Sequence, residues 1–247
     1  MTALTISVII PTLNEAAALP ALVATLAGQL PAEIIVVDGG STDGTAALAA
    51  SAGARVLVTR PGRGSQLAAG AEAAAGDILL FLHADTTFPA GGLAAIGAAL
   101  AADPALVGGN FTLLFDGGTP FDAWLTSRYA WARRRGLYYG DSGVFVRRDA
   151  YQRLGGIRPL ALMEDYEFTR RLERLGPTCC ITTPPLVTSS RRFAGRRPLA
   201  IVAGWILIHV LYHLGVPPAV LAWLYDSPRR RRHPAVQRPS SPFSAQS

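Results

Sequence analysis

The sequence predicts an α/β protein with a Rossmann-like, mostly parallel sheet flanked by helices. Short apolar runs rich in Val, Ile and Leu alternate with Ala-rich helical segments through the first half of the 247 residues. Uninterrupted apolar strands are typical of a sheet covered on both faces, and the alternation is the pattern of βαβ units with right-handed crossovers. Strands are predicted at residues 5–10, 34–37, 55–58 and 78–82, and helices at 15–30, 45–52 and 65–75.

The second half is less regular, and its composition changes twice. Strands are predicted at residues 107–115 and 144–146, and helices at 121–135 and 165–175. We expect a main α/β domain over residues 1–195 and an apolar helical extension over residues 196–228. Residues 229–247 are rich in Arg, Pro and Ser, which cannot fill a core, so a disordered tail is expected there.

The composition excludes several classes of protein. All 23 basic residues are Arg, and the formal net charge is +6. Without Lys the chain has neither a Walker-type phosphate loop nor a Schiff-base nucleophile. Cys179 and Cys180 are adjacent, so no disulfide framework is expected and a reducing cytoplasm fits. The first apolar run, residues 6–10, is too short for a signal peptide.

Polar residues gather where the predicted parallel strands end, and ligands of such sheets bind beyond these carboxyl ends. Asp38 ends the second strand and can accept hydrogen bonds from a nucleotide base or ribose; the alternative is a turn former, with Asp43 as a helix cap. A dinucleotide-binding fold needs a G-x-G-x-x-G turn after the first strand. Residues 11–15, PTLNE, lack it, so an oxidoreductase is disfavoured.

Asp85 follows the strand at 78–82 and is the candidate metal ligand. Mg²⁺ takes only one or two protein carboxylates when phosphate oxygens and water complete its shell, and a departing diphosphate needs its charge neutralised. Arg63 lies in a Gly-rich loop before a helix, where it can bind phosphate; the alternative is an ordinary loop.

Glu164 and Asp165 begin a predicted helix. Two consecutive carboxylates at this place can supply a general base, which has to reach a hydroxyl and stay unprotonated. The alternative interpretation is structural, because the helix dipole favours acidic residues in a first turn.

Five segments together resemble family 2 glycosyltransferases. They are PTLNE, VVDGGSTDGT, GRGSQLAAGAEAAAGDILLFLHADT, GDSGVFVRRDAYQRLGG and MEDYEFTRRLERLG. The similarity spans residues 4–193 and is strongest to the small bacterial "transferase 2" group found beside radical-SAM and selenium-related genes. The ordered set of motifs is much more specific than any one of them.

This resemblance implies a GT-A fold and an inverting transfer from a UDP- or GDP-sugar to an acceptor hydroxyl, with Mg²⁺ or Mn²⁺. Asp165 would be the catalytic base, with Glu164 beside it. Asp85 would bind the metal, and His83 stands where the family pattern has its first Asp. The donor would meet Pro11, Glu15, Asp38 (on the base), Arg63, Gln66, Ala84, Asp85, Asp141 and Arg192.

Two of these assignments have structural alternatives. Asp141, between Gly140 and Ser142, would contact the donor or acceptor sugar, or would simply form a turn. Arg192 would meet the diphosphate, or would end a basic surface strand. Two other functions remain as hypotheses. A nucleotidylyltransferase would need a Gly-rich basic signature with Lys, which is absent. A non-catalytic nucleotide-sugar-binding module would not need the three acidic residues Asp38, Asp85 and Asp165. No nucleic-acid partner is expected.

The apolar segment 199–225 is interrupted by Pro217 and Pro218, which leaves each half short of the ~20 residues of a membrane span. Arg residues flank the segment on both sides. We expect a helix hairpin in an anionic membrane interface at the inner face of the cell membrane, which would suit a lipid-like acceptor. The alternatives are packing on the core or in a homodimer. His213 would be a third metal ligand or a helix-packing residue.

Overall fold

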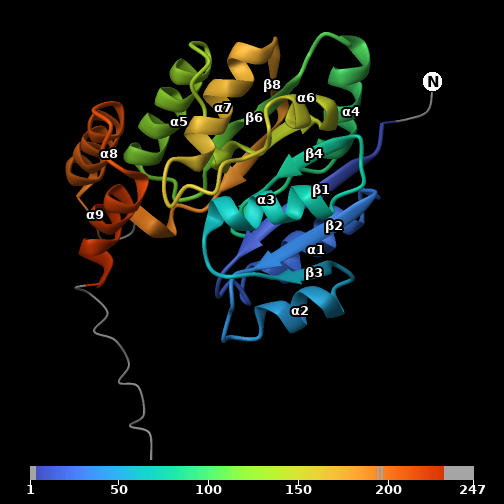
Figure 1. Cartoon of the computed structure of the whole chain (residues 1–247), viewed down its shortest axis with the longest axis horizontal. Helices are drawn as coiled ribbons and strands as arrows, with labels where there is room; N and C mark the ends of the chain where they lie inside the picture. The colour runs from blue at the N-terminus through green and yellow to red at the C-terminus, as the bar shows by residue number, and fades with distance from the viewer. Residues whose placement is uncertain (1–3, 194, 196, 231–247) are drawn as a thin grey trace, which may run out of the picture.

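One sheet lies between two layers of helices in a computed structural model that describes residues 4–193, 195 and 197–230 (Figure 1). Within these residues the sheet has the strand order β3-β2-β1-β4-β7-β6-β8-β5. The first four strands are parallel, as predicted, and β7 is antiparallel to its neighbours β4 and β6. The strands are β1 (Ile6–Thr12), β2 (Glu33–Asp38), β3 (Arg55–Val58), β4 (Ile78–Phe81), β5 (Thr86–Thr87), β6 (Gly108–Phe115), β7 (Val144–Arg147) and β8 (Thr178–Thr188).

Helices cover both faces of this sheet. α1, α2, α4 and α5 contribute apolar residues to the core on one side, and α3, α6 and α7 contribute to the core on the other. α8 and α9 lie side by side at one end of the molecule, next to α5 (Figure 1). The helices are α1 (Leu19–Ala27), α2 (Thr45–Ser51), α3 (Arg63–Ala73), α4 (Gly92–Ala102), α5 (Pro120–Arg133), α6 (Arg148–Arg153), α7 (Glu164–Leu175), α8 (Pro198–His213) and α9 (Pro218–Arg230).

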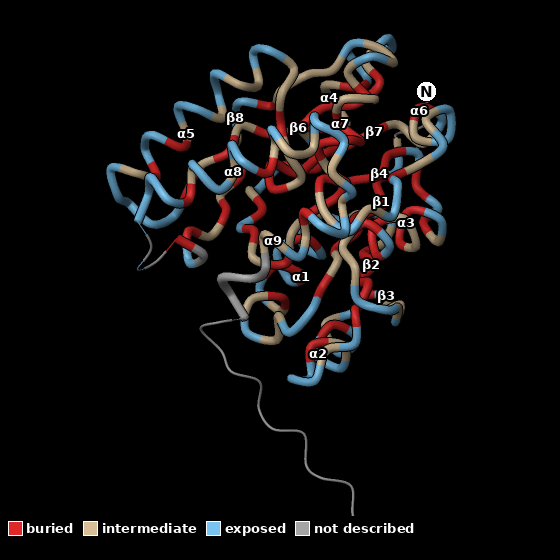
Figure 2. The backbone as a smooth tube through the Cα atoms, turned by 60° about the vertical axis from the view of Figure 1, so that its left-hand side comes forward, coloured by how far each residue is buried: buried red, intermediate tan, exposed pale blue. Residues whose placement is uncertain are grey.

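The apolar strands are buried on both faces, which confirms the reason given for a parallel sheet. In β1, Val8 and Ile10 join the core under α1, whereas Ile9 between them joins the core under α3. The centre of the sheet is accordingly buried along its length (Figure 2). Gly70 lets α3 approach closely, because a Cβ there would lie 2.5 Å from the Ile9 side chain.

Several helices and strands differ from the predicted elements. The helix expected from residue 15 begins at Leu19, because residues before it form a loop that bonds to the loop after β2. α4 was not predicted, since its Ala- and Gly-rich sequence has a weak apolar pattern. α9 runs to Arg230, two residues into the expected tail, and residues 231–247 lie outside the described part of the chain.

Glu167 and Arg171 form a largely buried structural contact. Arg171 donates to both Glu167 carboxylate oxygens at 2.7 and 2.8 Å. It also donates to the carbonyl oxygens of Leu154 and Gly156. The pair therefore fixes the loop that leads into α7, where Glu164 and Asp165 lie.

Arg171→Met is expected to lower the free energy of unfolding by about 3 kcal/mol, because it leaves the Glu167 carboxylate buried without its main counter-charge. Arg153→Met is the matched control. Arg153 forms an i,i+4 pair with Asp149 in which the side chains are 55% and 70% exposed, so its loss should change stability by less than about 0.5 kcal/mol. Urea unfolding of both variants measures the difference, and equal effects would contradict the structural role of Arg171.

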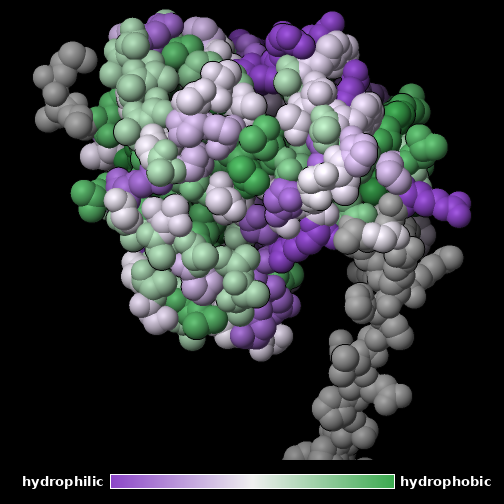
Figure 3. Space-filling view, turned by 180° about the vertical axis from the view of Figure 1, so that it is seen from behind, coloured by the Kyte–Doolittle hydropathy of each residue, from purple (hydrophilic) through white to green (hydrophobic). Residues whose placement is uncertain are grey.

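The C-terminal helices form the predicted hairpin, but one of its faces packs on the core. Ile208 and Leu221 are buried against Met163 and Tyr166 at the start of α7. Leu199, Leu214 and other apolar residues of this segment remain exposed. In the view from behind, hydrophobic residues gather at the margin of the molecule where these helices lie (Figure 3). Among the described helices, none has the length and hydropathy needed to cross a bilayer.

Candidate active site

The loops after β1 and β2 are bonded to each other at the carboxyl end of the sheet. Asp38 is 2% exposed. One of its carboxylate oxygens accepts from the backbone N–H groups of Gly40 and Ser41 at 3.0 and 2.8 Å, and the other accepts from the hydroxyls of Ser41 and Thr12. Burial by itself raises the pKa of Asp38, but these hydrogen bonds outweigh it and hold the pKa below the usual range. The carboxylate is ionised and shapes the loop, as its turn-forming interpretation requires.

Gln66, a predicted donor contact, is buried beneath the same loops. Its side-chain nitrogen donates to the carbonyl oxygens of Thr12 at 2.9 Å and Val37 at 2.7 Å, which ties α3 to the ends of β1 and β2. Pro11 lies near the end of β1, and Ala84 is buried in the core. A direct role of these three residues toward a donor stays a prediction.

Glu15 and Asp85 meet on a single guanidinium group. Nη2 of Arg191 lies 2.7 Å from a Glu15 carboxylate oxygen and 3.3 Å from an Asp85 carboxylate oxygen. The Glu15 and Asp85 side chains are 22% and 26% exposed, so solvent reaches both. Arg191 belongs to the 3-10 turn Arg191–Phe193, and the predicted role of its neighbour Arg192, whose side chain lies outside the described part of the structure, stays a prediction.

Two carboxylates that converge on one cation fit a divalent metal that takes its other ligands from diphosphate oxygens and water. Asp85, the predicted ligand, and Glu15 would hold such an ion. Within the described residues, no group of three His, Cys, Asp or Glu side chains is arranged to bind a metal. The site therefore suits an ion that binds together with a diphosphate.

Arg191→Ala is expected to increase the affinity for Mn²⁺ in the absence of nucleotide by about fivefold, because the two carboxylates lose a competing cation worth roughly 1 kcal/mol. Isothermal titration with Mn²⁺ measures the change. Arg55→Ala, which removes an exposed partner of Glu33, is the control and should have no effect. Unchanged or weaker Mn²⁺ binding by Arg191→Ala would show that the Glu15 and Asp85 carboxylates are not a cation site.

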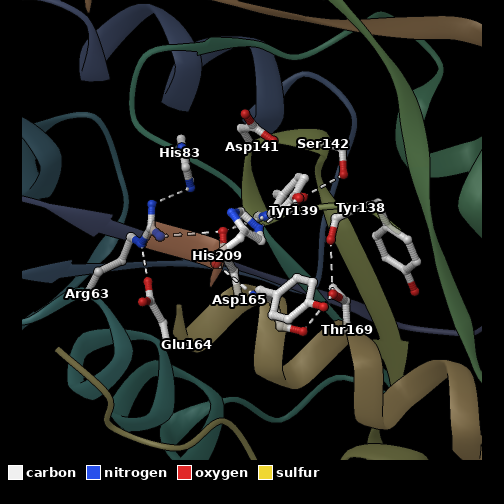
Figure 4. A network of polar contacts seen from close by, with 12 residues as sticks. Arg63, His83, Tyr138, Tyr139, Asp141, Ser142, Glu164, Asp165, Thr169 and His209 are labelled. Carbon is white, nitrogen blue, oxygen red and sulfur yellow. Dashed lines mark hydrogen bonds and ion pairs between the residues drawn. The ribbon is translucent and has the colours of Figure 1, made fainter. Parts of the chain in front are cut away.

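Arg63 lies between the predicted catalytic carboxylates (Figure 4). Its guanidinium forms a short ion pair with Glu164, lies 3.4 Å from an Asp165 carboxylate oxygen and is 3.5 Å from Nε2 of His83. Gly64 lets the segment that leads into α7 pack closely on α3, since a Cβ there would lie 3.0 Å from the carbonyl oxygens of residues 158 and 160. The predicted phosphate-binding Arg63 is thus held by the carboxylates of α7.

The two carboxylates have different environments and different pKa shifts. Burial raises the pKa of Glu164, whose side chain is only 2% exposed, although Arg63 opposes this shift. Burial also acts to raise the pKa of Asp165, but Arg63 and the N–H groups of Gly140 and Tyr166 outweigh it and lower the pKa. Asp165 is therefore ionised at neutral pH, as a general base has to be, and Glu164 holds Arg63 in place.

A cavity of about 830 Å³, the chamber, opens beside Asp165. It is lined by Arg63, His83, Asp141 and the two carboxylates of α7, together with residues of α5, α8 and α9. Asp141 is buried, and one of its carboxylate oxygens accepts from the Tyr129 hydroxyl at 3.1 Å. The structure therefore joins Asp141, Arg63, Glu164 and Asp165 in one cavity. It places Asp38, Gln66 and Asp85 outside the lining of that cavity, along the same edge of the sheet.

His213 packs between helices. Its Nε2 shares a hydrogen bond of 3.1 Å with the Tyr166 hydroxyl, and its ring meets the Tyr166 ring edge-on. His209, one turn earlier, shares a 3.0 Å hydrogen bond with the hydroxyl of Tyr139. Burial and the charge of Asp165 raise the pKa of Tyr139 to about 12, so this hydroxyl stays protonated. These contacts of His213 with α7 agree with its helix-packing interpretation.

Sequence reasoning missed Arg191 and the aromatic wall formed by Tyr139, Tyr166 and His209. The adjacent Arg pair was a signal for the first, but nothing in the sequence decides which of the two faces Glu15. For the wall, the cluster of Tyr and His residues was visible, but the contact between α7 and α8 arises only in the folded chain.

This is an α/β sheet with acids and guanidinium groups along the carboxyl ends of its strands, which is the edge where ligands of such sheets bind. The chain belongs to glycosyl transferase family 2, whose family model matches residues 7–155, more than half of its length. This confirms the resemblance found in the sequence motifs.

The relatives with curated descriptions match only part of the chain. An uncharacterized glycosyltransferase of Mycobacterium tuberculosis is 44% identical over 89 residues, which are 36% of this chain and 40% of that protein. Glucosyl-3-phosphoglycerate synthase of the same organism is 38% identical over 97 residues, or 34% of this chain and 30% of the synthase. This chain therefore spans less than half of either relative in these matches.

Solved structures share the fold over most of the chain. The M. tuberculosis glucosyl-3-phosphoglycerate synthase, in complex with Mn²⁺, UDP and glucosyl-3-phosphoglycerate, superposes with a TM-score of 0.62. The alignment covers 87% of this chain and 81% of the synthase at 23% identity. The same synthase has also been solved with Mg²⁺ and UDP. The expected GT-A type of α/β fold is confirmed.

Proposed function

We propose that this protein is an inverting glycosyltransferase that moves a sugar from a UDP-sugar to an acceptor hydroxyl with the help of Mg²⁺ or Mn²⁺. The observation that carries the proposal is the position of Asp165. It is an ionised carboxylate that lines the chamber, in a protein whose Glu15 and Asp85 converge on a cation at the carboxyl ends of the strands. UDP rather than GDP is favoured because the similar synthase structures contain UDP.

The reaction needs one displacement. Asp165 takes the proton of the acceptor hydroxyl, the hydroxyl oxygen forms a bond to the anomeric carbon, and the bond from that carbon to the diphosphate oxygen breaks on the opposite side. The electron pair leaves with UDP. A metal ion held by Asp85 would supply charge neutralisation for the diphosphate when bound. Glu164 and Arg63 hold Asp165 in place, and the Gly140 N–H fixes one of its oxygens.

The donor would lie along the carboxyl ends of β1, β2 and β4. We assign to this surface the loop shaped by Asp38, the acids Glu15 and Asp85, and Arg191 or Arg192 as a partner for the diphosphate. Pro11, Gln66 and Ala84 would support that loop from beneath. Asp141 would face the sugar, because it lines the same cavity as Asp165.

The exposed apolar face of α8 and α9 supports peripheral contact with the inner face of the cell membrane, in the cytoplasm, where a lipid-like acceptor would be found. Flotation with vesicles that contain anionic lipid tests this contact. If the protein instead sediments as a dimer and does not float, a second copy of the chain covers this face.

A thermal-shift titration tests the proposed donor. UDP with Mn²⁺ is expected to raise the melting temperature, GDP with Mn²⁺ to raise it less, and UDP with a chelator to have little effect. Asp85→Asn should lose the dependence on metal. If binding is preserved but no UDP-sugar is hydrolysed or transferred, the non-catalytic binding module becomes the better description.

A further inference from the structure

The lining of the chamber combines charged and apolar side chains. Asp165, Arg63 and Asp141 are among the charged residues, and Trp205 and Ile206 of α8 are among the apolar ones. The volume of about 830 Å³ is that of a site for an organic molecule of drug-like size, which is far larger than a single hydroxyl or a water needs. Something besides the reactive group of the acceptor therefore has room next to the base.

The charges around the chamber disfavour an anionic occupant. Three carboxylates face it, namely Asp141, Glu164 and Asp165, against two guanidinium groups among the described side chains. Arg63 is already bound to the α7 carboxylates, and Arg128 lies over the Trp131 ring at 4.3 Å. A phosphorylated acceptor would thus enter a cavity in which, among the described side chains, carboxylates outnumber guanidinium groups and Arg63 is already paired with two of them.

His209 and His213, which also line the chamber, have hydrogen-bond partners of their own. His209 shares hydrogen bonds with the Tyr139 hydroxyl and with the carbonyl oxygen of Trp205, and His213 bonds to Tyr166. These contacts build a wall of aromatic rings rather than an anion site. The wall begins beside Asp165, because Tyr166 follows it directly, and continues along α8.

We infer that the chamber is the acceptor site and that it takes an alcohol with an apolar body, such as a long alkyl or isoprenoid alcohol. The inference rests on the proposed function. The hydroxyl lies at Asp165, and the apolar body fills the space between α5, α8 and α9, where burial of apolar surface stabilises it. Transfer follows the displacement already given, with the alcohol oxygen bonded to the anomeric carbon and UDP released.

Two neighbouring residues of α8 provide a matched test of this site. Ile206 and Leu207 are similarly exposed, at 59% and 54%, but only Ile206 lines the chamber. Ile206→Trp places a large ring in the chamber and should raise the KM for the alcohol at least tenfold. Leu207→Trp points away and should leave KM and kcat unchanged. The thermal shift produced by UDP and Mn²⁺ shows whether each variant is folded.

The acceptor assay uses a UDP-sugar that the enzyme hydrolyses, with product detected by mass spectrometry. The acceptors are butanol, dodecanol, farnesol and 3-phosphoglycerate. We expect transfer to dodecanol and farnesol, with KM falling as the chain lengthens, and none to 3-phosphoglycerate. Farnesol is offered both free in dilute solution and in phosphatidylglycerol vesicles; faster transfer from vesicles identifies a membrane source, and equal or faster transfer from solution identifies a soluble one.

The outcomes separate this inference from the proposed function. Hydrolysis of a UDP-sugar together with transfer only to 3-phosphoglycerate, or equal effects of the two Trp variants, would overturn the acceptor class and leave the glycosyltransferase intact. Absence of metal-dependent UDP binding and of hydrolysis would instead overturn the proposed function, and the inference with it.

Discussion

Asp165→Asn is expected to reduce sugar transfer by about 10³-fold, the usual contribution of a general base, while UDP and Mn²⁺ still bind. The amide keeps the shape of the carboxylate and can still accept from the Gly140 N–H, but it cannot take a proton from the acceptor. The reduction should appear mainly in kcat, because Asp165 acts on the acceptor hydroxyl and lies outside the proposed nucleotide surface.

The matched control for this variant is Asp149→Asn, which alters a 70% exposed carboxylate on α6 and should change neither kcat nor binding. The lowered pKa of Asp165 adds a second expectation. Because the base stays ionised well below neutral pH, kcat/KM in the wild type should show no acid limb from this residue above about pH 4. Full activity in Asp165→Asn would show that another group takes the proton.

Arg63→Met is expected to lower the free energy of unfolding at pH 7 by about 2 kcal/mol and to suppress transfer. The substitution leaves Glu164 and Asp165 as neighbouring like charges without their shared counter-ion. The figure is below the ~3–5 kcal/mol typical of a fully buried pair, because the Arg63 side chain is 37% exposed and solvent screens part of the loss.

The stability difference between wild type and Arg63→Met should depend on pH with a definite sign. Without Arg63, the pKa of each carboxyl group rises, because burial still raises it and the guanidinium that lowers it is gone, so the folded variant binds protons more readily than the folded wild type. In the wild type the pKa of Asp165 lies below its value in the unfolded chain. The ionised carboxylate therefore stabilises the fold at a pH above the unfolded pKa, and this stabilisation is lost on acidification. The difference in the free energy of unfolding between wild type and Arg63→Met is therefore largest at neutral pH and becomes smaller toward about pH 4.

Urea unfolding of wild type and variant at pH 7, 5.5 and 4.5 measures this trend. Arg55→Met serves as a control, since Arg55 is 53% exposed in its pair with Glu33 and should give a small difference that changes little with pH. A difference for Arg63→Met that stays constant or grows on acidification would mean that Arg63 does not stabilise the ionised forms of Glu164 and Asp165.

The sheet, and the edge where its polar side chains gather, can be predicted from the local sequence. Uninterrupted runs of Val, Ile and Leu predict the strands β1, β2 and β4. Parallel strands bring their carboxyl ends to one edge of the sheet, so the shared location of Asp38 and Asp85 was predictable. Local patterns could not show how the polar side chains are used. Asp38 and Gln66 hold loops and strand ends, and Arg191 reaches Glu15, through contacts that join residues 26 to 176 positions apart.

The chamber could not be predicted for a related reason. Its apolar residues come mainly from α5, α8 and α9, and α8 and α9 also pack against the start of α7. The sequence of the apolar segment 199–225 alone is equally compatible with a membrane interface or a dimer. The arrangement is decided by specific contacts such as Tyr166 with His209 and His213, which the sequence does not pair.

The central claim is that a cation site at Asp85 and the base Asp165 serve one bound donor. A crystal structure with a UDP-sugar and Mn²⁺, with the metal located by its anomalous signal, tests it most directly. The account predicts Mn²⁺ bonded to Asp85 and to the diphosphate, Arg191 moved from its present contact, and the anomeric carbon facing the chamber beside Asp165. A nucleotide whose sugar points away from Asp165, or a metal that Asp85 does not touch, would contradict it.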